Sequence, residues 1–165
     1  MTLRKYQKED SKIICGWVKD AKTLFQWSAD RIGTFPLKGD ELNVKYAERD
    51  PDFFIPLTAL DDGGNVAGHL FILYPDQNDK SLVRFGFVIV SPDLRGKGNG
   101  RKMLELALEY AKNELGAKKV SLGVFENNPA ARRCYDSLGF VPTGVRAVTI
   151  LGEDWNCMDM EVELA

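Results

Sequence analysis

The chain has 165 residues and a net charge of −2, with its acidic and basic residues interspersed. This balance gives no bias toward nucleic acid or a membrane surface, and no apolar run approaches the length that spans a bilayer. Three cysteines without paired spacing favour a reducing, cytoplasmic location over a disulfide framework or a zinc site, so no metal is expected. The opening sequence MTLRKYQKED lacks the pattern of a signal peptide, and the length fits one domain over residues 1–165.

The first fifty residues predict one strand and three short helices. Residues 3–6 are expected to form the strand, and Asp10 or Ser11 is placed to cap the first helix. A second helix is expected after Asp20, and Asp40 is placed to cap a third. None of these elements carries a motif that identifies a function.

A predicted β-hairpin follows. Residues 53–60 and 66–74 are apolar strands joined by the turn-forming sequence DDGGN. Residues 81–90, SLVRFGFVIV, predict a third strand with at least one well-buried face, and Pro92 ends it. The only histidine, His69, is expected to be a half-buried strand residue.

A glycine-rich loop lies between this strand and a long helix. The helix is predicted from a single apolar stripe and should end at Gly116. Glycines let the backbone turn sharply and approach a ligand, and the free amides at the start of the helix favour a phosphate or pyrophosphate. The residues predicted to form this anion site are Arg95, Gly96, Lys97, Gly98, Asn99, Gly100 and Arg101.

Two common phosphate loops do not fit this sequence. A P-loop needs Gly-Lys-Ser/Thr, and here Gly98 follows Lys97. A dinucleotide fingerprint needs G-x-G-x-x-G and an acid closing the next strand, whereas this loop reads G-x-G-x-G. The loop instead resembles the cofactor motif of the GNAT-type N-acetyltransferases, Gln/Arg-x-x-Gly-x-Gly/Ala, filled by Arg95, Gly98 and Gly100. A simple helix-start turn is the alternative interpretation.

A second segment supports the same resemblance. Residues 127–140 predict a helix capped by Asn128 and ended by Gly139. The segment is similar to the second cofactor motif of the family, N-x-x-A-x-x-x-Y-x-x-x-GF. The matching residues are Asn128, Ala131, Tyr135, Gly139 and Phe140.

The order of predicted elements also resembles the GNAT fold. A strand at 119–124, a helix at 129–138 and final strands at 145–151 and 157–164 complete the chain. The resemblance implies a mixed α/β (α+β) fold with a twisted, mostly antiparallel sheet of about seven strands, flanked by helices and splayed at its central strands. It covers the chain from about residue 53 onward.

The resemblance implies an enzyme that moves an acetyl group from acetyl-coenzyme A, its cosubstrate, to a primary amine. The family binds the pantetheine arm along the backbone of the central strand, here Val88, Ile89 and Val90, where a strand amide faces the thioester oxygen. Tyr135 matches the general acid that protonates the leaving thiolate. Asn128 matches a contact to the pantetheine arm, and Arg133 is assigned to the coenzyme A phosphates, although a solvated helix face explains it nearly as well.

No general base is named. Some family members carry a glutamate at the position aligned with Gly123, which cannot take a proton. Glu126, Asp30 and Glu41 are other candidates, and a water relay or direct loss of the proton to solvent is an equal alternative. Asp159 belongs to a run of alternating acids expected on the solvent face of the last strand, where it would attract a cationic amine if it bordered the acceptor cleft.

The acceptor and the assembly stay open at this point. The acceptor can be a protein N-terminus, a lysine, a polyamine, an aminoglycoside or another small amine, and the protein can be a monomer or a homodimer. Two other classes of function remain: an acyl-coenzyme A sensor without turnover, and a nucleotide-binding module using the same anion site.

Overall fold

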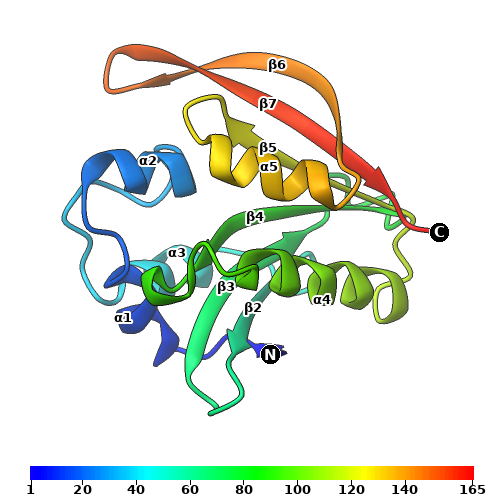
Figure 1. The fold of residues 1–165 in the computed structure, drawn as a ribbon, viewed down its shortest axis with the longest axis horizontal. Helices are drawn as coiled ribbons and strands as arrows, with labels where there is room; N and C mark the ends of the chain where they lie inside the picture. Colours follow the sequence, from blue (N-terminus) through cyan, green and yellow to red (C-terminus); the bar gives the residue numbers. More distant parts are fainter.

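A computed structural model describes residues 1–165 as a twisted sheet with helices on both faces (Figure 1). The strands are Thr2–Lys5 (β1), Phe54–Leu60 (β2), Val66–Leu73 (β3), Leu82–Val90 (β4), Lys119–Phe125 (β5), Val141–Ile150 (β6) and Glu153–Glu163 (β7). The α-helices are Asp10–Cys15 (α1), Ala21–Ser28 (α2), Glu41–Ala47 (α3), Asn99–Asn113 (α4) and Pro129–Ser137 (α5). The seven strands lie in the order β1-β2-β3-β4-β5-β7-β6, and every neighbouring pair is antiparallel except β4 and β5. The predicted fold class is confirmed.

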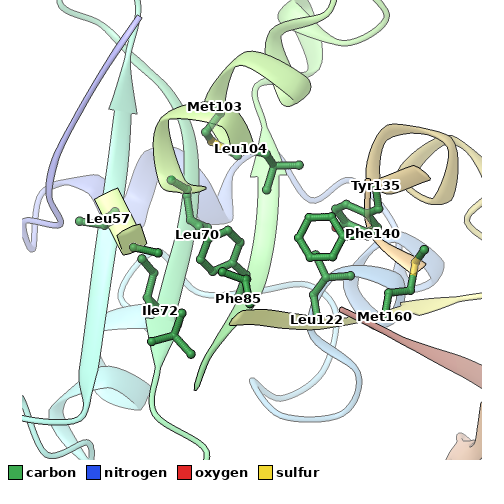
Figure 2. Close-up of a cluster of buried hydrophobic side chains, with 14 of the residues drawn as sticks. Leu57, Leu70, Ile72, Phe85, Met103, Leu104, Leu122, Tyr135, Phe140 and Met160 are labelled. Atoms are coloured by element: carbon green, nitrogen blue, oxygen red, sulfur yellow. The ribbon is translucent and has the colours of Figure 1, made fainter. Parts of the chain in front are cut away.

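The two faces of the sheet carry different helices and separate hydrophobic cores. The larger core lies under α4 and α5, and Figure 2 shows Met103 and Leu104 of α4 facing the sheet residues Leu70 and Phe85. The second core packs α1, α2 and α3 against the opposite face. None of these helices combines the length and apolarity that a membrane-spanning segment needs.

The sheet splays between its two parallel strands. β4 and β5 pair only from Leu82 opposite Lys119 to Arg84 opposite Ser121. Beyond these residues the strands separate, so the β5-facing edge of β4 has no ladder partner from Phe85 onward. The splay implied by the family resemblance is therefore present.

A β-bulge changes which side chains of β4 face each core. The register against β3 shifts after Gly86, and Phe87 takes a φ of 50°, which is rare for a residue with a side chain. Before the bulge, Phe85 packs under α4; after it, Phe87 and Ile89 pack in the opposite core and Val88 contacts the core under α4. Gly86 is required here because a Cβ would overlap the ring of Phe71.

The final hairpin is longer than its sequence predicts. The expected strands at 145–151 and 157–164 extend to Val141–Ile150 and Glu153–Glu163. Pro142 and Gly144 disfavour a strand locally, but pairing with β7 continues past them with a shift of register. Tertiary pairing outweighs local preference at this edge of the sheet.

Asp10 does not cap α1, because Glu9 holds the N-cap position and the Asp10 side chain is buried. Its carboxylate accepts two hydrogen bonds from Arg4, at 2.7 and 2.9 Å, one from the Gln7 amide at 2.9 Å and one from the Thr58 hydroxyl at 2.7 Å. These hydrogen bonds connect α1, through Asp10, to β1 at Arg4 and to β2 at Thr58. By contrast, Asp20 caps α2 as predicted and accepts from the amide of Thr23 at 2.7 Å.

His69 is fully buried, so the expectation of a half-buried position is wrong. Its Nε2 lies 2.7 Å from the Tyr46 hydroxyl and its Nδ1 lies 2.8 Å from the carbonyl of Leu57. Burial lowers the pKa of His69 to about 4, so the ring is neutral near pH 7. Its two hydrogen bonds connect α3, at Tyr46, to the sheet at Leu57.

Candidate active site

A cleft of about 360 Å³ opens where β4 and β5 separate, and its lining is mostly apolar. The starts of α4 and α5 and one side of α2 close it. Seven residues selected from the sequence line this cleft, which brings the two motifs and the central strand together. They are Val88, Ile89, Val90, Arg95, Gly100, Asn128 and Tyr135.

The glycine loop presents bare backbone at one end of the cleft. Gly96 and Gly98 have φ values of 73° and 80°, a conformation that side chains disfavour. A Cβ built on Gly96, Gly98 or Gly100 would meet no heavy atom within 4 Å. Helix α4 begins at Asn99, so its free amides open onto this unobstructed space. These features fit a pyrophosphate group such as that of coenzyme A.

The charged and polar side chains of the loop divide into two groups. Arg95 lines the cleft, donates from Nε to the carbonyl of Val90 at 3.3 Å, and has its pKa lowered by burial. Lys97 and Asn99 instead donate to loop carbonyls at 3.0 Å, while Arg101 pairs with Glu105 on α4 at 3.0 Å. These three do not line the cleft, and neither do Gly96, Gly98 and the exposed Arg133.

Tyr135 lies in the apolar part of the cleft with 6 % of its surface exposed. Its ring packs beside Phe140, at 5.9 Å between ring centroids, and Figure 2 shows the two above Leu122. Burial raises the pKa of the Tyr135 phenol, so the hydroxyl keeps its proton at neutral pH. The neighbouring Cys134 also lines the cleft. Asn128 caps α5 by accepting from the Ala131 amide at 3.4 Å.

A second cavity of about 140 Å³ adjoins the first. The two share lining residues at the splay, including Gly86, Phe87 and Gly123, and both include Trp27 of α2. The second cavity extends toward β6 and β7 and the loop after α2. Gln26 holds α2 in place by donating to the carbonyl of Asn127 at 2.8 Å. The two cavities are therefore neighbours at the splay.

An arginine occupies the space beside Gly123. A Cβ on Gly123 would lie 2.9 Å from Nη2 of Arg84 and 3.0 Å from Sγ of Cys157. The same Nη2 donates to Asp159 Oδ1 at 3.1 Å, and Arg146 Nε donates to Asp159 Oδ2 at 3.1 Å. Asp159 thus contacts two arginines that line the second cavity, and both of their guanidinium groups donate to it.

The three candidate bases differ in whether they line one of the two cavities. Glu126 is exposed, accepts from Asn156 at 3.2 Å and lines neither cavity. Glu41 lines neither cavity as well, whereas Asp30 lines the second. Sequence reasoning missed Arg84 and Arg146, and no local pattern marks them, because they come from strands far apart in the chain.

Comparison with known proteins identifies the family of the chain. The sequence model of the acetyltransferase (GNAT) family matches residues 18–140. Mycothiol acetyltransferase of Rhodococcus jostii is 29 % identical over 131 residues, covering 74 % of this chain and 43 % of that protein. Spermine/spermidine N(1)-acetyltransferase of Bacillus subtilis is 32 % identical over 71 residues, covering 43 % of this chain and 47 % of that protein. The match therefore spans less than half the length of each of these relatives.

Solved structures share the fold over nearly the whole chain. The spermidine N-acetyltransferase of Vibrio cholerae, in complex with CoA and spermine, superposes with a TM-score of 0.81 at 24 % identity. The superposition covers 98 % of this chain and 94 % of that chain.

Proposed function

This chain belongs to the acetyltransferase (GNAT) family, and we propose that it transfers an acetyl group from acetyl-coenzyme A to a primary amine. The observation that carries the proposal is the cleft at the splay, which joins the open glycine loop, the unpaired edge of β4 and the buried phenol of Tyr135. Two relatives named as spermine or spermidine acetyltransferases make polyamines one candidate class of acceptor.

Each part of the site has a separate role in the proposed reaction. The amine nitrogen forms a bond to the thioester carbonyl carbon, the carbon–sulfur bond breaks, and the nitrogen loses one proton to solvent, from which the Tyr135 hydroxyl is later reprotonated. A backbone amide of β4 at 88–90, fixed in an apolar cleft, stabilises the negative charge that develops on the carbonyl oxygen. Tyr135 gives its proton to the departing sulfur. Gly98 and Gly100 let the pyrophosphate approach the amides of α4.

Replacing Tyr135 with phenylalanine tests the proton donor. The expected loss of kcat is roughly tenfold or more, at the low end of general-acid effects because a thiolate leaves readily without a proton. Affinity for acetyl-coenzyme A should change little, since the ring and its packing against Phe140 remain. The measurement is steady-state release of free thiol. An unchanged kcat would assign Tyr135 to packing alone.

The pH dependence of kcat/KM tests the general base. Gly123 cannot accept a proton, Asp159 already binds two arginines, and Asp30 is exposed. We therefore expect the rate to rise with pH until the acceptor amine is neutral, near 10.4 for a lysine-like amine. A dedicated base would instead give a plateau starting around pH 6–7. Such a plateau, abolished by Asp30→Asn or by Glu126→Gln, would contradict this expectation and identify the base.

The two alternative functions make different predictions. An acyl-coenzyme A sensor would be stabilised by acetyl-coenzyme A and would release no thiol with any amine. A nucleotide-binding module would be stabilised by ATP or NAD in preference to acetyl-coenzyme A. A thermal-shift comparison of the three ligands, followed by a thiol-release assay against an amine library, separates them.

A further inference from the structure

Three arginines from different parts of the fold line the second cavity. Arg31 follows α2, Arg84 lies near the start of β4, and Arg146 lies in β6. All three line the second cavity, which adjoins the cleft at Gly86 and Gly123. A polycationic acceptor would require acidic side chains here, whereas three basic side chains line the second cavity.

The acids at this cavity leave positive charge in excess. The carboxylate of Asp159 accepts one hydrogen bond from Arg84 and one from Arg146, at 3.1 Å each. A guanidinium carries five N–H donors, so both arginines keep donors for a further acceptor. The side chain of Arg31 makes no hydrogen bond or ion pair with the protein. Asp30, the one acid that lines the cavity itself, is exposed and makes no ion pair.

The field at Arg31 indicates the same sign of ligand. Arg31 is exposed at the mouth of the cavity; partial desolvation and then the positive charges of Arg84, Arg146 and Arg49 lower its pKa, while the neighbouring Asp30 raises it. Holding cations together costs free energy, which a bound anion would offset. In addition, the indole Nε1 of Trp27, a residue lining both cavities, is buried without a hydrogen-bond acceptor.

We propose that the acceptor is a small amine that also carries a carboxylate, as in an amino acid, an inference that rests on the proposed acetyl transfer. Its carboxylate binds the guanidinium groups of Arg31, Arg84 and Arg146, and its amine reaches the splay beside Gly86. Arginine suits this role because its planar donors match the two oxygens of a carboxylate.

Matched pairs of amines, each an amino acid and its decarboxylated product, test the proposal. Lysine is compared with cadaverine and ornithine with putrescine, by thiol release at saturating acetyl-coenzyme A, with rates corrected for the neutral fraction of each amine. We expect kcat/KM to favour the amino acid by about tenfold to a hundredfold, the range of a charge-assisted hydrogen bond. Arg31→Gln should remove most of this preference and raise KM for the amino acid more than it lowers kcat.

Lys22→Gln is the matched control, because Lys22 is exposed on α2 and lines neither cavity. It removes the same charge and should leave the preference unchanged. Equal or better turnover of cadaverine and putrescine would overturn the carboxylate inference and leave acetyl transfer standing. Retention of the full preference in both Arg31→Gln and Arg146→Gln would also overturn it. No turnover with any amine, while acetyl-coenzyme A still stabilises the protein, would overturn acetyl transfer itself, and the acceptor inference with it.

Discussion

Gly100→Leu is expected to weaken binding of acetyl-coenzyme A by about a hundredfold or more, equivalent to about 2.7 kcal/mol, while the fold stays intact. Gly100 lines the cleft at the start of α4, and a Cβ there would meet no protein atom within 4 Å. Its φ is also outside the positive range, so a side chain adds no backbone strain. The leucine would therefore occupy space that the ligand needs.

Ligand-induced thermal stabilisation measures this effect. At a hundredfold excess over the dissociation constant, the wild-type protein should gain about 2.7 kcal/mol, roughly 5–11 °C in Tm for a chain of this size. Gly100→Leu should lose this shift and keep the Tm of the free protein. Gly144→Leu is the control, since Gly144 also has open surroundings and an ordinary φ but lies on β6 away from the cleft. A full shift in Gly100→Leu would show that the loop does not bind the cosubstrate.

Asp10→Asn is expected to lower the free energy of unfolding by about 3 kcal/mol at pH 7, or roughly 6–12 °C in Tm. The Asp10 side chain is 3 % exposed, and the guanidinium of Arg4 that binds it is itself 28 % exposed. The amide keeps the shape of the side chain but loses the charge and one acceptor oxygen, which leaves Arg4 without its counter-ion. Thermal and urea denaturation give the difference.

The effect of Asp10→Asn should depend on pH in one direction. Burial alone would raise the pKa of Asp10, but hydrogen bonds from Arg4, Gln7 and Thr58 outweigh it and hold the pKa below its ordinary value. The stabilisation is therefore complete above the unfolded pKa, about 3.9, and is lost as the pH falls through the lower folded value. Asp62→Asn, which removes an exposed ion pair with the N-terminal amine, should have little effect. A difference for Asp10→Asn that persists fully at pH 2 would contradict this account.

The cosubstrate side of the site could be predicted because each part is contiguous in the sequence. A loop with alternating glycines and a helix capped by Asn128 are local patterns, and the structure brings both to one cleft. The acceptor side could not be predicted in the same way. Arg31, Arg84 and Arg146 lie in a loop and two strands that meet only through the sheet order β4-β5-β7-β6.

The sequence also hid the change of face in β4. Residues at 83, 85, 87 and 89 are all buried, which reads as one continuous face in a strand of period two. The bulge sends the last two into the other core, and only Gly86 hints at it. Similarly, the partner of His69 comes from α3, more than twenty positions earlier in the chain.

Arg84 packs against Gly123, so a glutamate at 123 and an arginine at 84 compete for the same space. A glutamate at 123 would need the volume that the guanidinium of Arg84 fills, and Asp159 and Ser121 hold that guanidinium in place. A glutamate placed at 123 alone would displace the Arg84 guanidinium and disturb its pairing with Asp159. Across related sequences, an acid at this position should co-vary with the absence of arginine at 84. An engineer who wishes to install a proton acceptor here must redesign both strands in a single step.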